Sequence, residues 1–282
     1  MWRLNQWNCS TAELRELIEA CLEMGITTFD HADIYGGYTC ERLFGDVLEE
    51  APELRDRIRL ISKCGIKAVA ENRPQHQLPH YDSSRPHIIA SVEQSLQNLR
   101  TDYLDLLLIH RPDFLMDVDE VAEAFTTLQQ TDKVRHFGVS NFLPHQFELL
   151  ESRLDVPLVT NQVEFSVMNM DHLFDGTLDQ CQKERIVPMV WSPFGGGDMF
   201  TADTQQTIRV RQALRQVGDE LGGLTIDQTA LAWIMTHPTN PVPILGTGRL
   251  ERLRRAADVA DRELDRQQWY RIWSASMGQP VP

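Results

Sequence analysis

The chain has 282 residues, of which 42% are hydrophobic and 24% are charged, so it is long enough to bury a substantial core. Its 41 acidic residues outnumber its 27 Lys and Arg, which gives a formal net charge of −14. A balance this acidic argues against nucleic acid or an anionic membrane as the main partner. It still allows a local basic pocket that holds a phosphate group.

The cysteines and the apolar runs indicate where the protein works. The chain has 5 cysteines and no CxxC pair, which is typical of reduced thiols in the cytoplasm. No apolar run approaches the ~20 residues that a membrane span needs. The N-terminus MWRLNQWNCS lacks the apolar core of a signal peptide. We therefore expect a cytoplasmic protein with no membrane partner.

Helical and strand-like segments alternate along the chain. Short β-rich runs predict seven strands, at residues 26–30, 58–64, 104–110, 134–140, 158–162, 186–192 and 242–246. Apolar residues at helical spacing predict helices at residues 13–25, 40–52, 87–100, 118–130, 144–154, 173–184, 205–222, 225–236, 249–260 and 266–276.

This alternation predicts an α/β fold in which crossover helices join parallel strands, as in a (β/α)8 TIM barrel. A closed barrel needs eight strands, and only Met1 to Leu4 remain for a strand before the first helix. We therefore expect most of the first strand to be missing. No linker, low-complexity stretch or repeat divides the chain, which predicts one domain over residues 1–282.

Polar and small residues stand at the carboxyl end of every predicted strand. In a barrel these ends converge on one face, where active sites lie. A single such residue has an ordinary explanation, and Asp30 alone fits a helix N-cap equally well. The recurrence on every strand is what favours a functional site. The residues are Asp30, Lys63, His110, Ser140, Asn141, Gln162, Trp191, Ser192, Gly246 and Thr247.

Four of the polar residues together make an acid–base unit. Tyrosine is a poor acid at neutral pH, but a nearby ammonium group favours its phenolate and lowers its pKa. Lys63 is placed to supply that charge to Tyr35, Asp30 to hold Lys63, and His110 to hydrogen-bond at the same oxygen. Such a tyrosine suits the protonation of a developing alkoxide. Tyr35 as a packed loop aromatic, and Lys63 as a structural ion-pair partner, remain alternatives.

Six separated motifs resemble the aldo-keto reductases, in particular the bacterial oxidoreductase branch related to potassium-channel β subunits. The resemblance is specific because the six occur in the family's order over nearly the whole chain. They are FDHADIYGG (29–37), ISKCG (61–65), LLLIHRPD (106–113), VRHFGVSNF (134–142), TNQVEFS (160–166) and WSPFGGG (191–197).

The resemblance implies a barrel that uses NADPH or, less often, NADH. It implies a catalytic set of Asp30, Tyr35, Lys63 and His110. It further implies that a larger set binds the cofactor: Trp2, Ser140, Asn141, Gln162, Trp191, Ser192, Phe194, Gly195, Gly246, Thr247, Gly248, Arg249 and Arg252.

The sequence departs from the family pattern in two places. Many members have Lys or Arg directly after the last strand for the 2′-phosphate of NADP, where this chain has Gly246 and Thr247. A helix N-terminus with Arg249 or Arg252 is the alternative phosphate site, so the choice between NADP and NAD stays open. The second departure is at the N-terminus, where the sequence lacks the family's N-terminal hairpin and most of its first strand.

These patterns predict an enzyme that reduces an aldehyde or ketone, with Tyr35 as the proton donor. The alternatives are a cofactor-binding redox sensor or regulatory subunit with little turnover, and a barrel hydrolase, which lacks a second carboxylate on a neighbouring strand. We expect a small carbonyl substrate of open identity, no nucleic acid, and a monomer or weak oligomer. No metal site is expected, because Pro79 lies between His76 and His80 and prevents a helical ligand pair.

Overall fold

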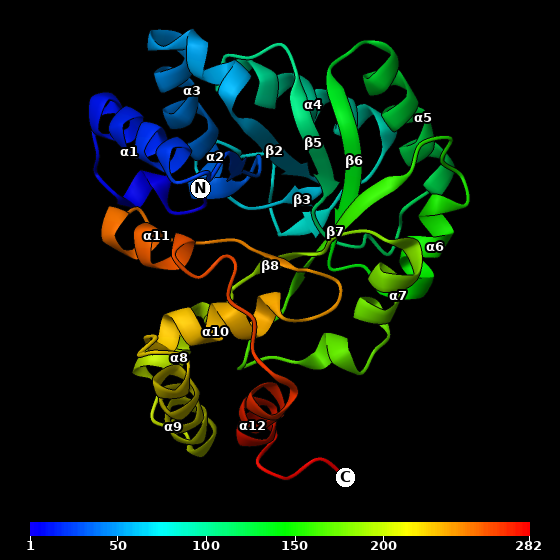
Figure 1. The fold of residues 1–282 in the computed structure, drawn as a ribbon. Helices are drawn as coiled ribbons and strands as arrows, with labels where there is room; N and C mark the ends of the chain where they lie inside the picture. The colour runs from blue at the N-terminus through cyan, green and yellow to red at the C-terminus, as the bar shows by residue number, and fades with distance from the viewer. The chain divides into compact units, whose positions relative to one another are not determined.

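The computed structural model describes residues 1–282, which pack as two compact units, Met1–Asn161 and Gln162–Pro282. Figure 1 shows strands and helices alternating along the chain in both units. We describe each unit separately.

Parallel strands form the centre of the first unit. In spatial order they are β1 (Thr28–Asp30), β2 (Arg59–Cys64), β5 (Leu104–Ile109), β6 (Val134–Ser140) and the start of β7 (Leu158–Glu164). Every residue of β5 is buried, as expected for a strand of a parallel sheet that is covered on both faces. The register pairs Asp30 of β1 with Ile61 of β2, and Lys63 of β2 with Leu108 of β5.

The helices of the first unit follow from apolar stripes and caps in the sequence. Ser10 begins the first of them with a capping box, in which its side chain and that of Glu13 bond reciprocally to the backbone. Pro144 stands at the first position of the last one, where its missing N–H costs nothing. The helices are α1 (Thr11–Glu23), α2 (Tyr35–Tyr38), α3 (Cys40–Glu50), α4 (Arg85–Leu99), α5 (Val118–Gln130) and α6 (Pro144–Glu151).

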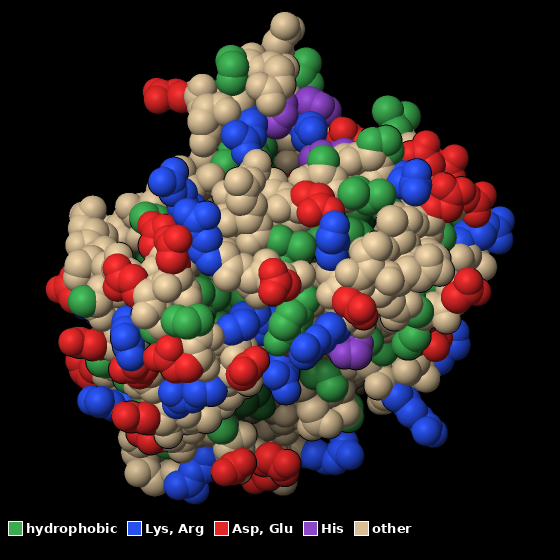
Figure 2. Space-filling view, turned by 90° about the horizontal axis from the view of Figure 1, so that it is seen from above, with side chains coloured by type: hydrophobic (Ala, Val, Ile, Leu, Met, Phe, Trp, Pro, Cys, Tyr) green, Lys and Arg blue, Asp and Glu red, His purple; other side chains and the backbone are tan.

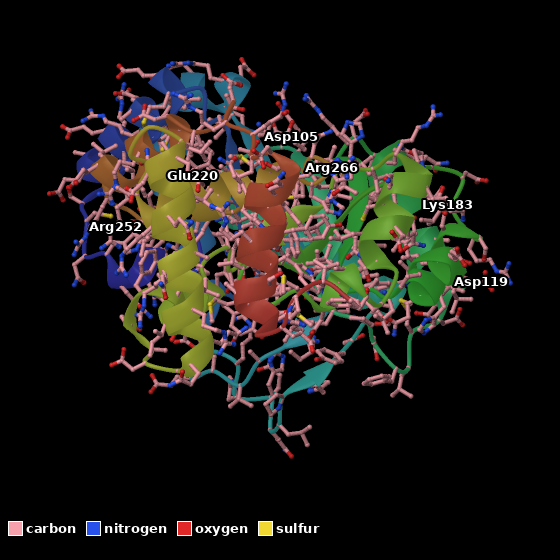
Figure 3. All side chains as sticks on the ribbon, turned by 60° about the horizontal axis from the view of Figure 1, so that its bottom comes forward. Asp105, Asp119, Lys183, Glu220, Arg252 and Arg266 are labelled. Carbon is pink, nitrogen blue, oxygen red and sulfur yellow. The ribbon has the colours of Figure 1, made fainter.

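A small antiparallel pair departs from the β-then-α rule between β2 and α4. Strand β3 (Ile66–Lys67) pairs with β4 (His80–Tyr81), and the chain between them forms a loop. We call residues Ile66–Tyr81 the excursion. Figure 3 shows it, in cyan, projecting from the ribbon of this unit.

The second unit contains the rest of β7, then β8 (Met189–Trp191) and β9 (Val242–Pro243), again parallel and in chain order. Its core centres on Trp233, which stacks on Trp269 with ring centroids 4.8 Å apart. Helices α9 and α12 lie side by side (Figures 1 and 3). The helices are α7 (Thr177–Glu184), α8 (Asp198–Thr201), α9 (Gln205–Glu220), α10 (Ile226–Met235), α11 (Leu250–Ala257) and α12 (Arg266–Met277).

The seven predicted strands all form, although several are shorter than the β-rich runs suggest. The segment before α1 forms a 3-10 turn, Leu4–Gln6, and no strand, in agreement with the expected lack of a first strand. The predicted helix over 173–184 is in fact a 3-10 turn, Asp171–Leu173, followed by α7, because Gly176 in a left-handed conformation interrupts it. Acidic and basic side chains are interspersed on the face in Figure 2. None of the helices is both long and apolar enough to cross a membrane.

Candidate active site

The carboxyl ends of β1, β2 and β5 bring four predicted residues together in the first unit. Backbone hydrogen bonds continue the parallel pairing beyond the strands. The His31 N–H donates to the Ile61 carbonyl at 2.8 Å, and the His110 N–H donates to the Cys64 carbonyl at 2.9 Å. The residue after β1 is therefore held against β2, and the residue after β5 against the end of β2.

Lys63 is the centre of this group. Its side chain is 0% exposed, and its ammonium group donates three hydrogen bonds. The acceptors are Asp30 Oδ2 at 2.7 Å, the His31 carbonyl at 2.8 Å and the Tyr35 hydroxyl at 3.0 Å. A fully buried ammonium is stable only when paired and hydrogen-bonded in this way. Burial lowers the pKa of Lys63, but Asp30 and Tyr35 more than offset burial, so its net pKa is raised and it stays charged.

The surroundings of Tyr35 act on its pKa in opposite directions. Burial raises the pKa, the charge of Lys63 lowers it and that of Asp30 raises it, and the net pKa lies above the ordinary tyrosine value. The prediction of a lowered pKa is therefore wrong in its net direction, although Lys63 acts in the predicted sense. The phenol keeps its proton at neutral pH, and Lys63 stabilises the phenolate once the proton leaves.

His110 lies beside Tyr35, with the two ring centroids 5.9 Å apart and the ring planes at 77°. Burial, Lys63 and Arg111 together hold the pKa of His110 well below its ordinary value, so the imidazole is neutral. Its Nδ1 atom is buried and has no hydrogen-bond partner in the protein. A buried polar atom without a partner is costly, and where one occurs it commonly marks a place for a ligand or water.

The remaining predicted residues of the first unit lie at the end of β6 and near the N-terminus. Ser140 is 1% exposed and accepts a hydrogen bond at 2.7 Å from the amide of Asn141, whose φ of 60° is left-handed. Asn161 fixes the next turn, because its side chain bonds both the N–H and the carbonyl of Phe142, at 3.4 and 2.7 Å. Trp2 is 49% exposed, with the Arg3 guanidinium over its ring.

The second unit carries its predicted cofactor residues on β7 and on the loop after β8. Gln162 is 2% exposed and lies on β7, and Trp191 ends β8. Beyond them, four residues of the loop have left-handed φ angles, and Phe194, within the same loop, packs against Phe200. Two of their N–H groups donate within the loop, that of Gly195 to the Ser192 carbonyl at 2.8 Å and that of Gly197 to the Phe194 carbonyl at 3.1 Å. The four are Ser192, Gly195, Gly196 and Gly197.

The glycines of this loop are needed for two different reasons. A Cβ on Gly195 would lie 2.9 Å from the Cβ of Met168, so the site has no room for a side chain. A Cβ on Gly196 or Gly197 would meet nothing within 4 Å, and only their φ angles of 65° and 110° disfavour another residue. The open side of this backbone fits a bulky anionic group such as a pyrophosphate.

The segment after β9 leads into the N-terminus of α11, a helix of eight residues. Arg249 is the N-cap residue, and its N–H is bonded to the hydroxyl of Thr247 at 3.2 Å. Arg249 and Arg252 are both exposed, and Gly246 and Gly248 flank Thr247 in irregular chain (Arg252 is labelled in Figure 3). Helix N-termini with nearby guanidinium groups favour phosphate, so these residues fit the adenosine phosphate of the cofactor.

Sequence reasoning missed three residues that shape the first unit's site. The carbonyl of His31 is the third acceptor for Lys63, and its buried imidazole packs against Phe44 at 4.7 Å. Asn161 clamps the turn after β6, and Tyr38 anchors the excursion, as described below. A backbone acceptor leaves no signal in a sequence, but the pair Asn161–Gln162 at a strand end could have pointed to Asn161.

Comparison with known proteins identifies the family to which the chain belongs. A family model described as "Aldo/keto reductase family" matches residues 1–276. The chain is 54% identical to the uncharacterized oxidoreductase YcsN of Bacillus subtilis (strain 168), covering 100% of this chain and 94% of that protein. It is 45% identical to the 6-dehydroglucose reductase of Agrobacterium fabrum, with the same coverage of 100% and 94%.

A solved structure agrees with the sequence relatives. The thermostable aldo-keto reductase Tm1743, crystallised with the inhibitor epalrestat, has a TM-score of 0.79 and 29% identity, covering 94% of this chain and 88% of that one. The α/β fold of the barrel type is thereby confirmed. The chain belongs to the aldo/keto reductase family, whose members are oxidoreductases that use nicotinamide cofactors.

Proposed function

We propose that the protein reduces an aldehyde or ketone to the alcohol with NADPH, and that Tyr35 donates the proton. The observation that carries this proposal is the hydrogen bond of 3.0 Å from the buried Lys63 ammonium to the Tyr35 hydroxyl. A permanently charged donor at a phenol oxygen has a clear use in proton transfer. A packed loop aromatic has no need of it.

The chain's own residues account for the proton half of the reaction. The cofactor, when bound, supplies the hydride that the carbonyl carbon accepts. Tyr35 gives its proton to the carbonyl oxygen, so that an alcohol forms and a phenolate remains. Lys63 stabilises that phenolate, Asp30 holds Lys63 in place at 2.7 Å, and water restores the proton afterwards.

Neutral His110 has a different part in the proposal. Because its pKa is held well below the ordinary value, it is not the proton source at neutral pH. One of its ring nitrogens carries a proton and can donate a hydrogen bond to the carbonyl oxygen. It thereby orients the carbonyl toward Tyr35 and polarises it.

The cofactor-binding role divides between two chemically distinct sets of residues. Ser140, Asn141 and Gln162 offer hydroxyl and amide groups of the kind that bind a carboxamide, and Trp191 offers an aromatic face for the nicotinamide ring. The left-handed loop 192–197 has open space beside Gly196 and Gly197, where the pyrophosphate can approach the backbone closely. Arg249 and Arg252 at the start of α11 favour the additional phosphate of NADP over NAD.

We further propose that the substrate is a small hydroxylated carbonyl compound, of the class of oxidised sugars. The relative from Agrobacterium fabrum is named a 6-dehydroglucose reductase and is 45% identical over the full length of this chain. We place the reaction in the cytoplasm, since all five cysteines are free thiols.

NADPH oxidation in the presence of a panel of carbonyl compounds tests the proposal. The panel contains a glucose derivative oxidised to the aldehyde at C6, hexanal, and a diketone. We expect turnover with NADPH, and a higher kcat/KM for the sugar aldehyde than for hexanal. Tightly held cofactor with negligible turnover on every compound would instead support a redox sensor or regulatory subunit.

A further inference from the structure

The turn that follows Tyr35 has an unusual backbone. Gly36, Gly37 and Tyr38 have φ angles of 59°, 66° and 67°, so three successive residues are left-handed. Glycine adopts this conformation freely, but for a tyrosine it is strained, because the Cβ lies too close to the following carbonyl oxygen. Such a residue persists only where its surroundings hold it in place.

The Tyr38 hydroxyl makes the contacts that hold it. It accepts a hydrogen bond from the Ala68 N–H at 2.9 Å and lies 3.1 Å from the Ala68 carbonyl, to which it donates. One phenol therefore bonds both backbone groups of a single residue in the excursion. Burial raises the pKa of Tyr38, so it keeps the proton that it donates.

Other contacts join the excursion to the same turn. The Asn72 amide donates to the Gly37 carbonyl at 3.0 Å, and the Arg73 guanidinium lies 4.5 Å from the centre of the Tyr38 ring. His76 is 7% exposed, and its Nδ1 is 2.9 Å from the Ala68 carbonyl. We call this set, centred on Tyr38, the latch.

The excursion is placed and composed to meet a polar ligand. It begins at Ile66, two residues after β2 ends at Cys64 and three after Lys63 of the catalytic group. The latch bonds it to the turn that carries Tyr35. Half of its exposed residues carry amide, carboxylate or imidazole groups, and the other half are Val69, Pro74, Leu78, Pro79 and Tyr81. The exposed polar residues are Glu71, Asn72, Gln75, Gln77 and His80.

We propose that Tyr38 is a positioning residue, which latches the excursion to the catalytic turn so that its polar groups recognise substrate hydroxyls away from the reacting carbonyl. The inference rests on the proposed carbonyl reduction and deepens it. It assigns to the excursion the preference for a hydroxylated over a plain aldehyde.

Tyr38→Phe is the direct test, because it removes both bonds to Ala68 and keeps the ring beneath Arg73. Without these two bonds the excursion is held less firmly to the turn, and a tenfold change in affinity corresponds to about 1.4 kcal/mol. We expect KM for the C6 sugar aldehyde to rise about tenfold. KM for hexanal, and kcat for both aldehydes, should change by less than about twofold. Tyr270→Phe, at an exposed tyrosine of the second unit, is the matched control.

Hydrogen exchange at the Ala68 amide supplies a second readout that does not depend on turnover. Its protection should be lost in Tyr38→Phe and kept in the control. Asn72→Ala, which removes one outer contact, should shift KM in the same direction by a smaller factor, and it serves if Tyr38→Phe does not fold.

The outcomes separate the two proposals. A wild-type protein that reduces neither aldehyde overturns the proposed function. A wild-type protein that prefers the sugar aldehyde, with the preference unchanged in Tyr38→Phe, overturns the inference alone. Unchanged exchange at Ala68 in Tyr38→Phe also overturns it, because the latch would then not be held by the phenol.

Discussion

The acid–base group of the first unit and the loop after β8 in the second are built in opposite ways. Lys63, on a strand, bonds three partners at 2.7–3.0 Å through its buried side chain. The loop 192–197 presents backbone instead, and the Cβ positions of Gly196 and Gly197 are open. In the function we propose, packed side chains hold the proton donor in one geometry. The charged parts of the cofactor are then bound by backbone and exposed arginines.

Replacing Lys63 should have the largest effect, because it removes the side chain on which the acid–base group of the first unit depends. Lys63→Met removes the cation that neutralises Asp30 and supports the phenolate. We expect kcat to fall by roughly 10²–10⁴ and the free energy of unfolding by roughly 3–5 kcal/mol. Steady-state kinetics and urea unfolding measure the two effects. Lys183→Met is the control, since the Lys183 side chain is 68% exposed and should change neither quantity.

Asp33, close behind the catalytic group, gives a pH-dependent prediction. Burial raises the pKa of Asp33 to about 7, although Ser91 donates to its Oδ2 at 2.7 Å. The unfolded chain loses this proton near pH 4, whereas the folded chain keeps it to about pH 7. The free energy of unfolding should therefore fall as pH rises between these values, by at most about 4 kcal/mol.

Asp33→Asn isolates that contribution because an amide does not titrate. Urea unfolding from pH 4 to pH 8 should show a flatter profile for the variant than for wild type. Asp203→Asn, at a side chain that is 92% exposed, should leave the wild-type slope intact. Parallel profiles for wild type and Asp33→Asn would show that Asp33 ionises normally in the folded protein.

Replacing Arg252 tests the proposed phosphate site of the second unit and should have the smallest effect on kinetics. Arg252→Ala removes one exposed guanidinium from the first turn of α11. We expect KM for NADPH to rise about tenfold, in the range of one charged hydrogen bond, with KM for NADH unchanged. Arg254→Ala, in the last turn of the same helix, is the control. An equal rise in KM for NADPH and NADH would show that Arg252 does not contact the 2′-phosphate.

The grouping of polar side chains in the first unit is predictable from the sequence because the ends of its strands are recognisable. The buried run LDLLLI followed by His110, and the β-rich run that carries Lys63, predict both the strands and the side chains at their ends. The parallel register then brings those ends together. That Asp30, Tyr35 and Lys63 meet is thus a consequence of the α/β pattern.

What the sequence does not predict depends on contacts distant in the chain. The two-residue strands β3 and β4 are too short to show any periodicity, and the left-handed Tyr38 bonds Ala68, a residue 30 positions away in the chain. The net pKa of Tyr35 depends on burial, which outweighs the charge of Lys63. Residue types alone reveal the partners but not which of two opposing effects is larger.

Proton donation by Tyr35 is tested most directly by the kcat of Tyr35→Phe for reduction of the C6 sugar aldehyde with saturating NADPH, measured beside Tyr270→Phe. We predict a loss of roughly 10²–10⁴ in kcat for Tyr35→Phe, with NADPH affinity close to wild type. The free energy of unfolding should fall by about 1–3 kcal/mol, because the buried Lys63 ammonium loses one acceptor, and the control should keep the wild-type kcat. Full turnover by Tyr35→Phe would contradict the assignment of Tyr35 as the acid.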